Sequence, residues 1–150
     1  MTEARATGVA VEELGAGDPR LESELFPLLR QLRPRLTREQ FGELATTGHE
    51  QGLRYLVAYA DGAALAAAGY RVLVTSRGRI LYVDDLVTAE EARSTGVGGR
   101  LMSEVEQLAR RHGCALLELD SGVSNTAAHR FYIRNGFDII AHHFAAAVPR

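Results

Sequence analysis

The chain lacks several features that would place it in particular functional classes. Its 150 residues include one cysteine, Cys114, so no intramolecular disulfide can form, and a reducing cytosol is the simplest compartment. The 17 basic and 19 acidic residues leave a net charge of −2, without the positive excess of a general nucleic-acid or membrane-surface protein. The longest apolar stretch, residues 63–69, is too short to cross a bilayer, and the N-terminus has no signal pattern. We therefore predict one cytoplasmic globular domain over residues 1–150, with no membrane partner.

The first half of the sequence predicts a strand, two helices and an antiparallel meander. Leucines at helical spacing favour a helix that ends before Pro34, and Thr37 with Gln40 forms a capping-box pattern for the next helix. Asp61-Gly62 is a strong hairpin signal. The predicted elements are strand Thr7–Glu13, helix Leu21–Leu32, a helix from Thr37 to about Thr47, and strands Leu53–Ala60, Ala63–Thr75 and Arg79–Thr88.

The second half predicts a parallel crossover. An amphipathic helix over Gly98–His112 is followed by a short apolar strand, Ala115–Asp120, which we expect to be buried on both faces. A helix over Asn125–Arg134 and a last long strand, Phe137–Phe144, complete the chain. The order β-α-α-β-β-β-α-β-α-β predicts the α/β class, with a mixed sheet covered by helices on both faces.

The strongest chemical signal is a glycine-rich loop between a predicted strand and a predicted helix, R-S-T-G-V-G-G-R-L over residues 93–101. Gly96 and Gly98 allow a tight turn, so successive N–H groups can converge on a pyrophosphate at the positive end of the helix dipole. A Walker loop would need a lysine that the segment lacks, and the third glycine of a Rossmann loop is also absent. The alternative is a plain glycine loop that begins a helix.

Two motifs together resemble the GNAT superfamily of N-acetyltransferases. The loop resembles the Q/R-x-x-G-x-G/A signature, and N-T-A-A-H-R-F-Y-I-R-N-G-F over residues 125–137 resembles the N-x-x-A-x-x-F-Y-x-x-x-G-F helix of that family. The element order also matches, so the resemblance covers nearly the whole chain. Thr88 and Glu90 depart from the family pattern, which usually has an apolar residue and a proline there. The resemblance implies a fold with two splayed central strands and direct acetyl transfer from acetyl-coenzyme A to an amine.

The resemblance also implies which residues bind the co-substrate. The backbone of one strand should pair with the pantetheine arm, successive loop amides should hold the pyrophosphate, and Asn125 should hydrogen-bond a pantetheine amide. The predicted binding residues are Leu86, Val87 and Thr88 on the strand, and Arg93, Ser94, Thr95, Gly96, Val97, Gly98 and Gly99 in the loop.

Three residues are candidates for proton transfer. Tyr132 lies where the family places a tyrosine beside the departing sulfur, and it is the predicted general acid, with a purely packing role as the alternative. Asp84 and Asp85 are candidates for the general base, Asp84 first, with substrate binding or loop attachment as the alternative. An ideal strand would point only one of them toward the substrate, but a bulge at this point, common in the family, could redirect either.

The sequence does not identify the acetyl acceptor more closely than as an amine of a small molecule or peptide. Arginines 30, 33, 35 and 38 cluster where the acceptor pocket of this fold usually lies, which suggests an anionic group on the substrate or simply a solvated helix face. The alternatives to an enzyme acting on small molecules are an acyl-coenzyme A sensor without turnover and an acetyltransferase acting on a protein or aminoacyl-tRNA. We predict no metal site, because the adjacent His142 and His143 would point to opposite faces of a strand. The oligomeric state stays open, although homodimers are common in the superfamily.

Overall fold

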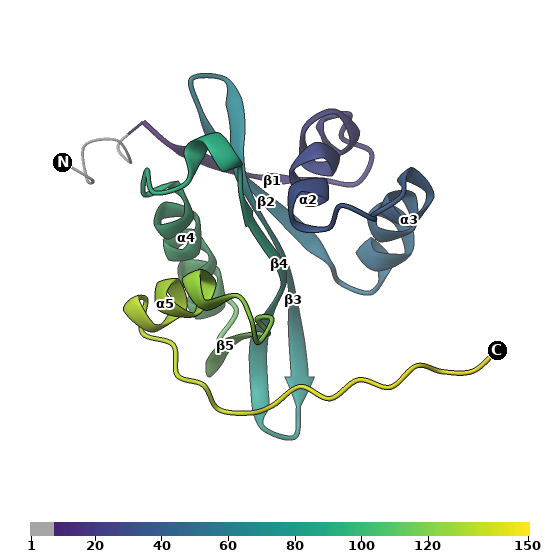
Figure 1. Cartoon of the computed structure of the whole chain (residues 1–150), viewed down its shortest axis with the longest axis vertical. Coiled ribbons are helices and arrows are strands. Elements are labelled where there is room, and N and C mark those ends of the chain that lie inside the picture. The colour runs from purple at the N-terminus through teal and green to yellow at the C-terminus, as the bar shows by residue number, and fades with distance from the viewer. Residues whose placement is uncertain (1–7) are drawn as a thin grey trace. The chain divides into compact units, whose positions relative to one another are not determined.

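The structure, a computed structural model, describes residues 8–150, and Thr7 of the predicted first strand lies outside them. The chain divides into two compact units, one up to Glu118 and the other Leu119–Arg150. Figure 1 shows the elements of both. No helix in the described part of the chain has both the length and the hydropathy needed to span a bilayer.

The sheet has five strands in the order β1-β2-β3-β4-β5. The register is antiparallel from β1 through β4, which confirms the predicted meander. Asp61 and Gly62 both adopt positive φ angles, 52° and 76°, in the β2–β3 hairpin that the sequence predicts. The strands are β1 (Ala10–Leu14), β2 (Arg54–Ala60), β3 (Ala63–Thr75), β4 (Gly78–Thr88) and β5 (Leu116–Leu119).

The helical elements begin and end close to the predicted positions. Thr37 caps α3 with both bonds of a capping box: its side chain accepts from the Gln40 amide, and its own amide donates to the Gln40 side chain. Gly113, with φ +65°, follows the last turn of α4. The helical elements are η1 (Leu21–Leu25), α2 (Phe26–Leu32), α3 (Arg38–Glu43), η2 (Leu44–Gly48), η3 (Glu90–Ala92), α4 (Val97–Arg111) and α5 (Thr126–Arg134).

In the first unit, helices cover both faces of the sheet. α2 packs against β3 and β4 on one face, and α4 packs against β2, β3 and β4 on the other (Figure 1). Leu25 and Leu29 fill the core on the α2 side, while Leu101 and Val105 fill it on the α4 side, each 1% exposed or less. This burial fixes β4 between two layers and so fixes the position of its polar residues.

Two expectations for the C-terminal part are wrong. Residues 137–150, all of which the structure describes, form neither helix nor strand, so the predicted last strand is absent. The alternation of the segment favours extended backbone, but a strand also needs a hydrogen-bonding neighbour, and the second unit, Leu119–Arg150, offers none beyond the end of β5. Its apolar Ile139 and Phe144 are accordingly 77% and 91% exposed. Strand β5 is also not buried on both faces: its Leu116 is 44% exposed, and its other three residues are only partly buried.

Candidate active site

A β-bulge on β4 brings the two candidate carboxylates to one face of the sheet. Gly69 on β3 pairs with Asp85 and the next residue, Tyr70, pairs with Val83, so Asp84 is the extra residue of the bulge. The side chain of Asp84 meets Arg71, which lies on the same face of β3 as Gly69. The bulge therefore removes the alternation that would have separated Asp84 from Asp85.

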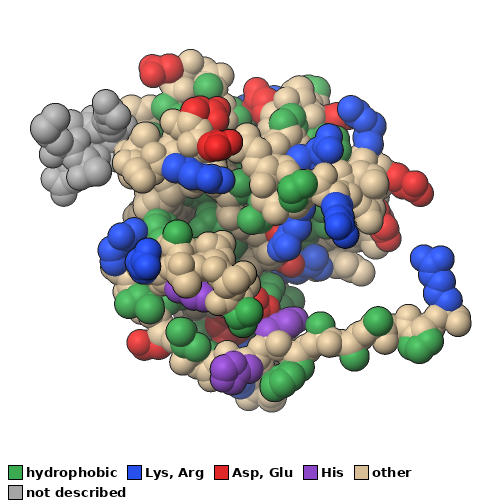
Figure 2. Space-filling view, viewed as in Figure 1, with side chains coloured by type: hydrophobic (Ala, Val, Ile, Leu, Met, Phe, Trp, Pro, Cys, Tyr) green, Lys and Arg blue, Asp and Glu red, His purple; other side chains and the backbone are tan. Residues whose placement is uncertain are grey.

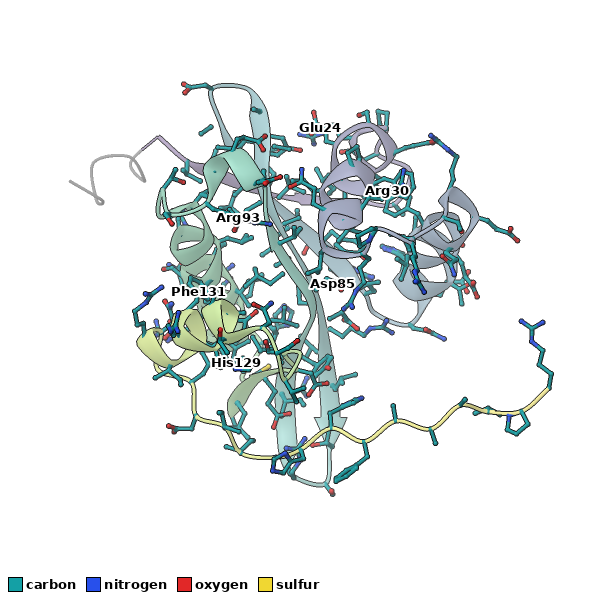
Figure 3. All side chains as sticks on the ribbon, in the orientation of Figure 1. Glu24, Arg30, Asp85, Arg93, His129 and Phe131 are labelled. Carbon is teal, nitrogen blue, oxygen red and sulfur yellow. The ribbon has the colours of Figure 1, made fainter. Side chains whose placement is uncertain are left out.

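Each carboxylate is held by one arginine. The Nε of Arg71 donates to both carboxylate oxygens of Asp84, at 3.2 and 3.1 Å. Arg33, which follows α2, donates through Nε and Nη2 to one oxygen of Asp85, at 3.0 and 2.9 Å. Figure 3 labels Asp85 on β4, on the side of the sheet that faces α2. The two ion pairs fix the carboxylates in place and join the sheet to the end of α2.

The environment of Asp84 favours a proton acceptor. Burial raises the pKa of the Asp84 carboxyl above its ordinary value of 3.8, the hydrogen bonds and charge of Arg71 oppose that rise, and the charge of Asp85 adds to it. A carboxylate with a raised pKa is a stronger base than an exposed one, so Asp84 is suited to take a proton from an amine.

A cavity of about 760 Å³ lies next to these ion pairs. Both arginines that hold the carboxylates, Arg33 and Arg71, line it, as does Arg35. Figure 2 shows Arg side chains gathered over the region of α2 and α3. The other lining residues come mainly from the α2–α3 connection and from α3 and η2: Leu32, Pro34, Leu36, Gln40, Glu43, Leu44, Thr47, Gly48 and Gln51.

The glycine-rich loop forms an open helix N-terminus. Gly96 precedes α4 with φ +88°, a left-handed conformation that favours glycine, and no side chain caps the helix. The N–H groups of the first turn, Val97, Gly98 and Gly99, have no acceptor within the helix because of its geometry. Ser94 also has a positive φ, 62°, and Arg93 stands just before it (Figure 3). The loop thus presents several backbone donors and a cation at the positive end of a fifteen-residue helix.

The end of β4 that leads into this loop has a neighbouring strand, β3, on one of its two edges only. Leu86, Val87 and Thr88 pair with residues 66–68 of β3. On the other edge, β5 meets β4 near its beginning, where the Ala115 amide donates to the Arg79 carbonyl at 2.8 Å. Because β5 is only four residues long, it ends before it can reach the end of β4. A ligand with amide groups can therefore add along that edge.

In the second unit, Tyr132 on α5 is half-buried among aromatic rings. Its ring lies edge-on to Phe131 and Phe137, with centroids 5.5 and 5.7 Å away. Burial raises the pKa of the Tyr132 phenol, so it keeps its proton at neutral pH and can act as a donor.

The remaining polar candidates of the second unit have local hydrogen bonds. The Asn125 side chain accepts from the Ala128 amide at 3.3 Å and so caps α5, which leaves its NH₂ group available. His129 Nε2 lies 2.7 Å from the Gly122 carbonyl, and His143 Nδ1 lies 3.1 Å from Asp120. Within residues 8–150, no group of three His, Cys, Asp or Glu side chains is arranged to hold a metal ion.

Comparison with known proteins decides the family. The model of the Acetyltransferase (GNAT) family matches residues 20–137 of this chain. The chain is a member of the GNAT acetyltransferase family. Its relatives include the uncharacterized N-acetyltransferase YhdJ of Bacillus subtilis (strain 168), 30% identical over 129 residues, which cover 84% of this chain and 91% of YhdJ. Glucosamine 6-phosphate N-acetyltransferase 1 of Oryza sativa subsp. japonica is 35% identical over 123 residues, covering 73% of this chain and 70% of the rice protein.

Solved structures show the same fold. Aminoglycoside N-acetyltransferase AAC(6')-Iy in complex with CoA superposes with a TM-score of 0.79 at 18% identity, over 93% of this chain and 94% of that one. As a member of the GNAT acetyltransferase family, the chain uses acetyl-coenzyme A as its acetyl donor, and the sequence-based prediction of the co-substrate is confirmed. The free amides of Val97–Gly99 in the first turn of α4 fit the diphosphate of that molecule. The amides of Arg93 and Thr95, which the sequence also suggested as donors, instead donate to carbonyls of η3, at 3.4 and 3.3 Å.

Sequence reasoning missed the partners of the two carboxylates and one further side chain of this GNAT acetyltransferase. Arg33 belongs to the arginine cluster that the sequence shows, but its bond to Asp85 joins residues 52 positions apart. The further side chain is Tyr55 on β2, which belongs to no motif and whose ring lies against Gly69 of β3. The one signal in the sequence was Gly69 itself, because a glycine inside a strand often marks a bulge or a close approach of another group.

Proposed function

We propose that this GNAT acetyltransferase transfers the acetyl group to a primary amine of a small molecule that also carries an acidic group. The observation that carries the proposal is the cavity of about 760 Å³ whose arginines hold Asp84 and Asp85. That volume is typical of small-molecule sites. It favours a small acceptor over a protein or an aminoacyl-tRNA.

One unpaired arginine of the cavity favours an acidic acceptor over a polycation. Three arginines and Glu43 line the cavity, and Asp85 and Asp84 pair with two of those arginines. Arg33 and Arg71 already bind carboxylates, whereas no ion pair or hydrogen bond engages Arg35 within the described residues. A guanidinium without a partner binds phosphate or carboxylate well. Two relatives act on substrates of this chemistry by name: the glucosamine 6-phosphate enzyme and an aminoalkylphosphonate N-acetyltransferase of Salmonella typhimurium.

The residues of the chain divide the work of the reaction. Backbone amides of Val97–Gly99 hold the diphosphate beside the Arg93 side chain, and the free edge of Leu86–Thr88 aligns the pantetheine arm, with Asn125 as a further donor. Acetyl-coenzyme A supplies an activated acetyl group as a thioester. The Asp84 carboxylate takes a proton from the acceptor amine, whose nitrogen then bonds to the acetyl carbon as the carbon–sulfur bond breaks. Tyr132 gives its proton to the departing sulfur, and the proton lost by the amine can restore it.

The test is release of free coenzyme A thiol with acetyl-coenzyme A and a panel of amines. The panel contains 2-aminoethylphosphonate, glucosamine 6-phosphate, its phosphate-free control glucosamine, kanamycin, spermidine and a peptide that begins with alanine. We expect the highest kcat/KM with a phosphate- or phosphonate-bearing amine, and Arg35→Gln should remove most of that preference. Because all 17 basic residues are arginine, the chain has no lysine side chain to acetylate itself and confuse the assay.

Three outcomes would change the proposal. Glucosamine acetylated as well as glucosamine 6-phosphate would contradict the acidic acceptor. Highest activity on the peptide would favour a protein acceptor. Tight binding of acetyl-coenzyme A with no transfer to any amine would favour a sensor without turnover.

A further inference from the structure

The hydroxyl of Tyr55 is buried and has no hydrogen-bond partner among the described residues. Tyr55 lies on β2 and is 5% exposed, and its oxygen is the one buried side-chain N or O atom in the described part of the chain without a partner. Two other tyrosines of the sheet are satisfied: Tyr59 donates to Glu24 at 2.5 Å, and Tyr70 donates to Glu13. An unpaired buried hydroxyl destabilises the folded protein, so its presence here needs a reason other than folding.

A glycine opens the path for this ring across the sheet. Tyr55 pairs with Gly69 on β3, and Gly69 pairs on its other side with Asp85 on β4, so the three residues share one face. A Cβ at residue 69 would lie 2.7 Å from Cε1 of the tyrosine ring. The missing side chain therefore lets the ring lie over β3 and extend toward the bulge.

The ring extends toward the carboxylates of the candidate active site. Burial raises the pKa of the Tyr55 phenol most strongly, and the negative charges of Asp85 and Asp84 raise it further, while Arg71 opposes the rise. The hydroxyl thus stays protonated and lies in the field of both carboxylates. Arg33 and Arg71, which bind those carboxylates, line the acceptor cavity. Tyr55 itself lines a smaller pocket that shares Leu44 with this cavity, so its hydroxyl lies behind the carboxylates rather than on the cavity wall.

We propose that Tyr55 is an acceptor-binding residue whose hydroxyl hydrogen-bonds the amino group that becomes acetylated. This inference rests on the proposed function. The phenol oxygen accepts a hydrogen bond from an N–H group of the amine, while the negative charges of Asp84 and Asp85 attract the amine in its protonated form. These three fixed groups orient the nitrogen before its proton leaves, and no loop has to become ordered, because packing already holds the hydroxyl in place. The unpaired hydroxyl is then the partner that the substrate completes.

The test is Tyr55→Phe, which removes the oxygen and keeps the ring over Gly69. With the panel amine that the wild type acetylates fastest, we expect KM for the amine to rise on the order of tenfold, as for a lost hydrogen bond. KM for acetyl-coenzyme A should not change. Tm should stay the same or rise, because the variant loses no bond within the protein. The matched control, Tyr59→Phe on the same strand, breaks its bond to Glu24 and should lower Tm while leaving KM for the amine unchanged.

The failures can be told apart. An unchanged KM for the amine in Tyr55→Phe overturns the role of Tyr55 and leaves the proposed function standing. A lower Tm overturns it as well, since the hydroxyl would then serve folding, and this measurement needs no substrate. A wild type that acetylates no amine in the panel overturns the proposed function itself and, with it, an acceptor-binding role.

Discussion

Arg71 on β3 donates its Nε–H group to both oxygens of Asp84, the extra residue of the β4 bulge. The ion pair sets how readily Asp84 takes a proton, because Arg71 lowers a pKa that burial raises. If Asp84 is the general base, activity should therefore fall as the pH is lowered, and the fall should begin above the ordinary carboxyl pKa of 3.8.

Arg71→Gln should move the acid limb of the kcat/KM profile to higher pH by about one unit or more, because burial then acts without an opposing charge. The variant should also be less stable at pH 7, where the carboxylate is left buried without its cation. That loss should shrink as the pH falls and Asp84 becomes protonated, since a carboxyl with a raised folded-state pKa favours the fold only below that pKa. Chemical denaturation at several pH values and a pH–rate profile measure both effects.

The control for this pair is Arg77→Gln, which breaks a second arginine–carboxylate pair of the same unit, with Glu118. Its acid limb should coincide with that of the wild type. If Arg71→Gln and Arg77→Gln give the same profile, Asp84 is not the base.

Tyr132→Phe should lower kcat by about 10²–10⁴-fold and leave the affinity for coenzyme A unchanged, because the variant keeps the aromatic packing with Phe131 and Phe137 but has no proton to give. Steady-state kinetics and calorimetric titration with coenzyme A measure the two quantities. Full turnover in the variant would leave Tyr132 with a packing role only.

Two glycines with positive φ flank α4, and replacing each with alanine distinguishes the effect of backbone strain on stability from the loss of coenzyme A binding. Gly96 and Gly113 have φ +88° and +65°. Each substitution should reduce the free energy of unfolding by about 1–2 kcal/mol, but only Gly96→Ala should weaken coenzyme A binding, because only that end presents free amides. Equal coenzyme A affinity in the two variants would remove the diphosphate from this loop.

Gly69→Ala should destabilise the protein by about 1–3 kcal/mol, because the new methyl group would overlap the Tyr55 ring. Gly42→Ala in α3 is the matched comparison: its Cβ would meet nothing within 4 Å, so it should gain about 0.5–1 kcal/mol from helix propensity. Urea denaturation of both variants checks the opposite signs. A neutral Gly69→Ala would mean that the ring does not need the space above β3.

Several turns and caps of this protein are determined by residues that lie close together in the sequence, and they could be predicted for that reason. The capping box at Thr37, the Asp61-Gly62 hairpin and the glycine loop before α4 depend on residues only a few positions apart. The pairing of Arg33 with Asp85 and the seat of Tyr55 over Gly69 depend on strand register, which no short motif contains.

The last predicted strand shows the same limit. The alternation in residues 137–144 favours an extended chain, and the chain is extended there. Pairing, however, depends on a neighbour that the pattern of the segment cannot supply, and none is present in Leu119–Arg150.

The most direct test of the account is a crystal structure of the protein with coenzyme A. We expect the diphosphate to accept hydrogen bonds from amides of Val97–Gly99 and the pantetheine arm to lie along the free edge of Leu86–Thr88, with its sulfur directed toward the Asp84 bulge. A coenzyme A molecule bound elsewhere, or one whose sulfur points away from Asp84 and the neighbouring cavity, would contradict it.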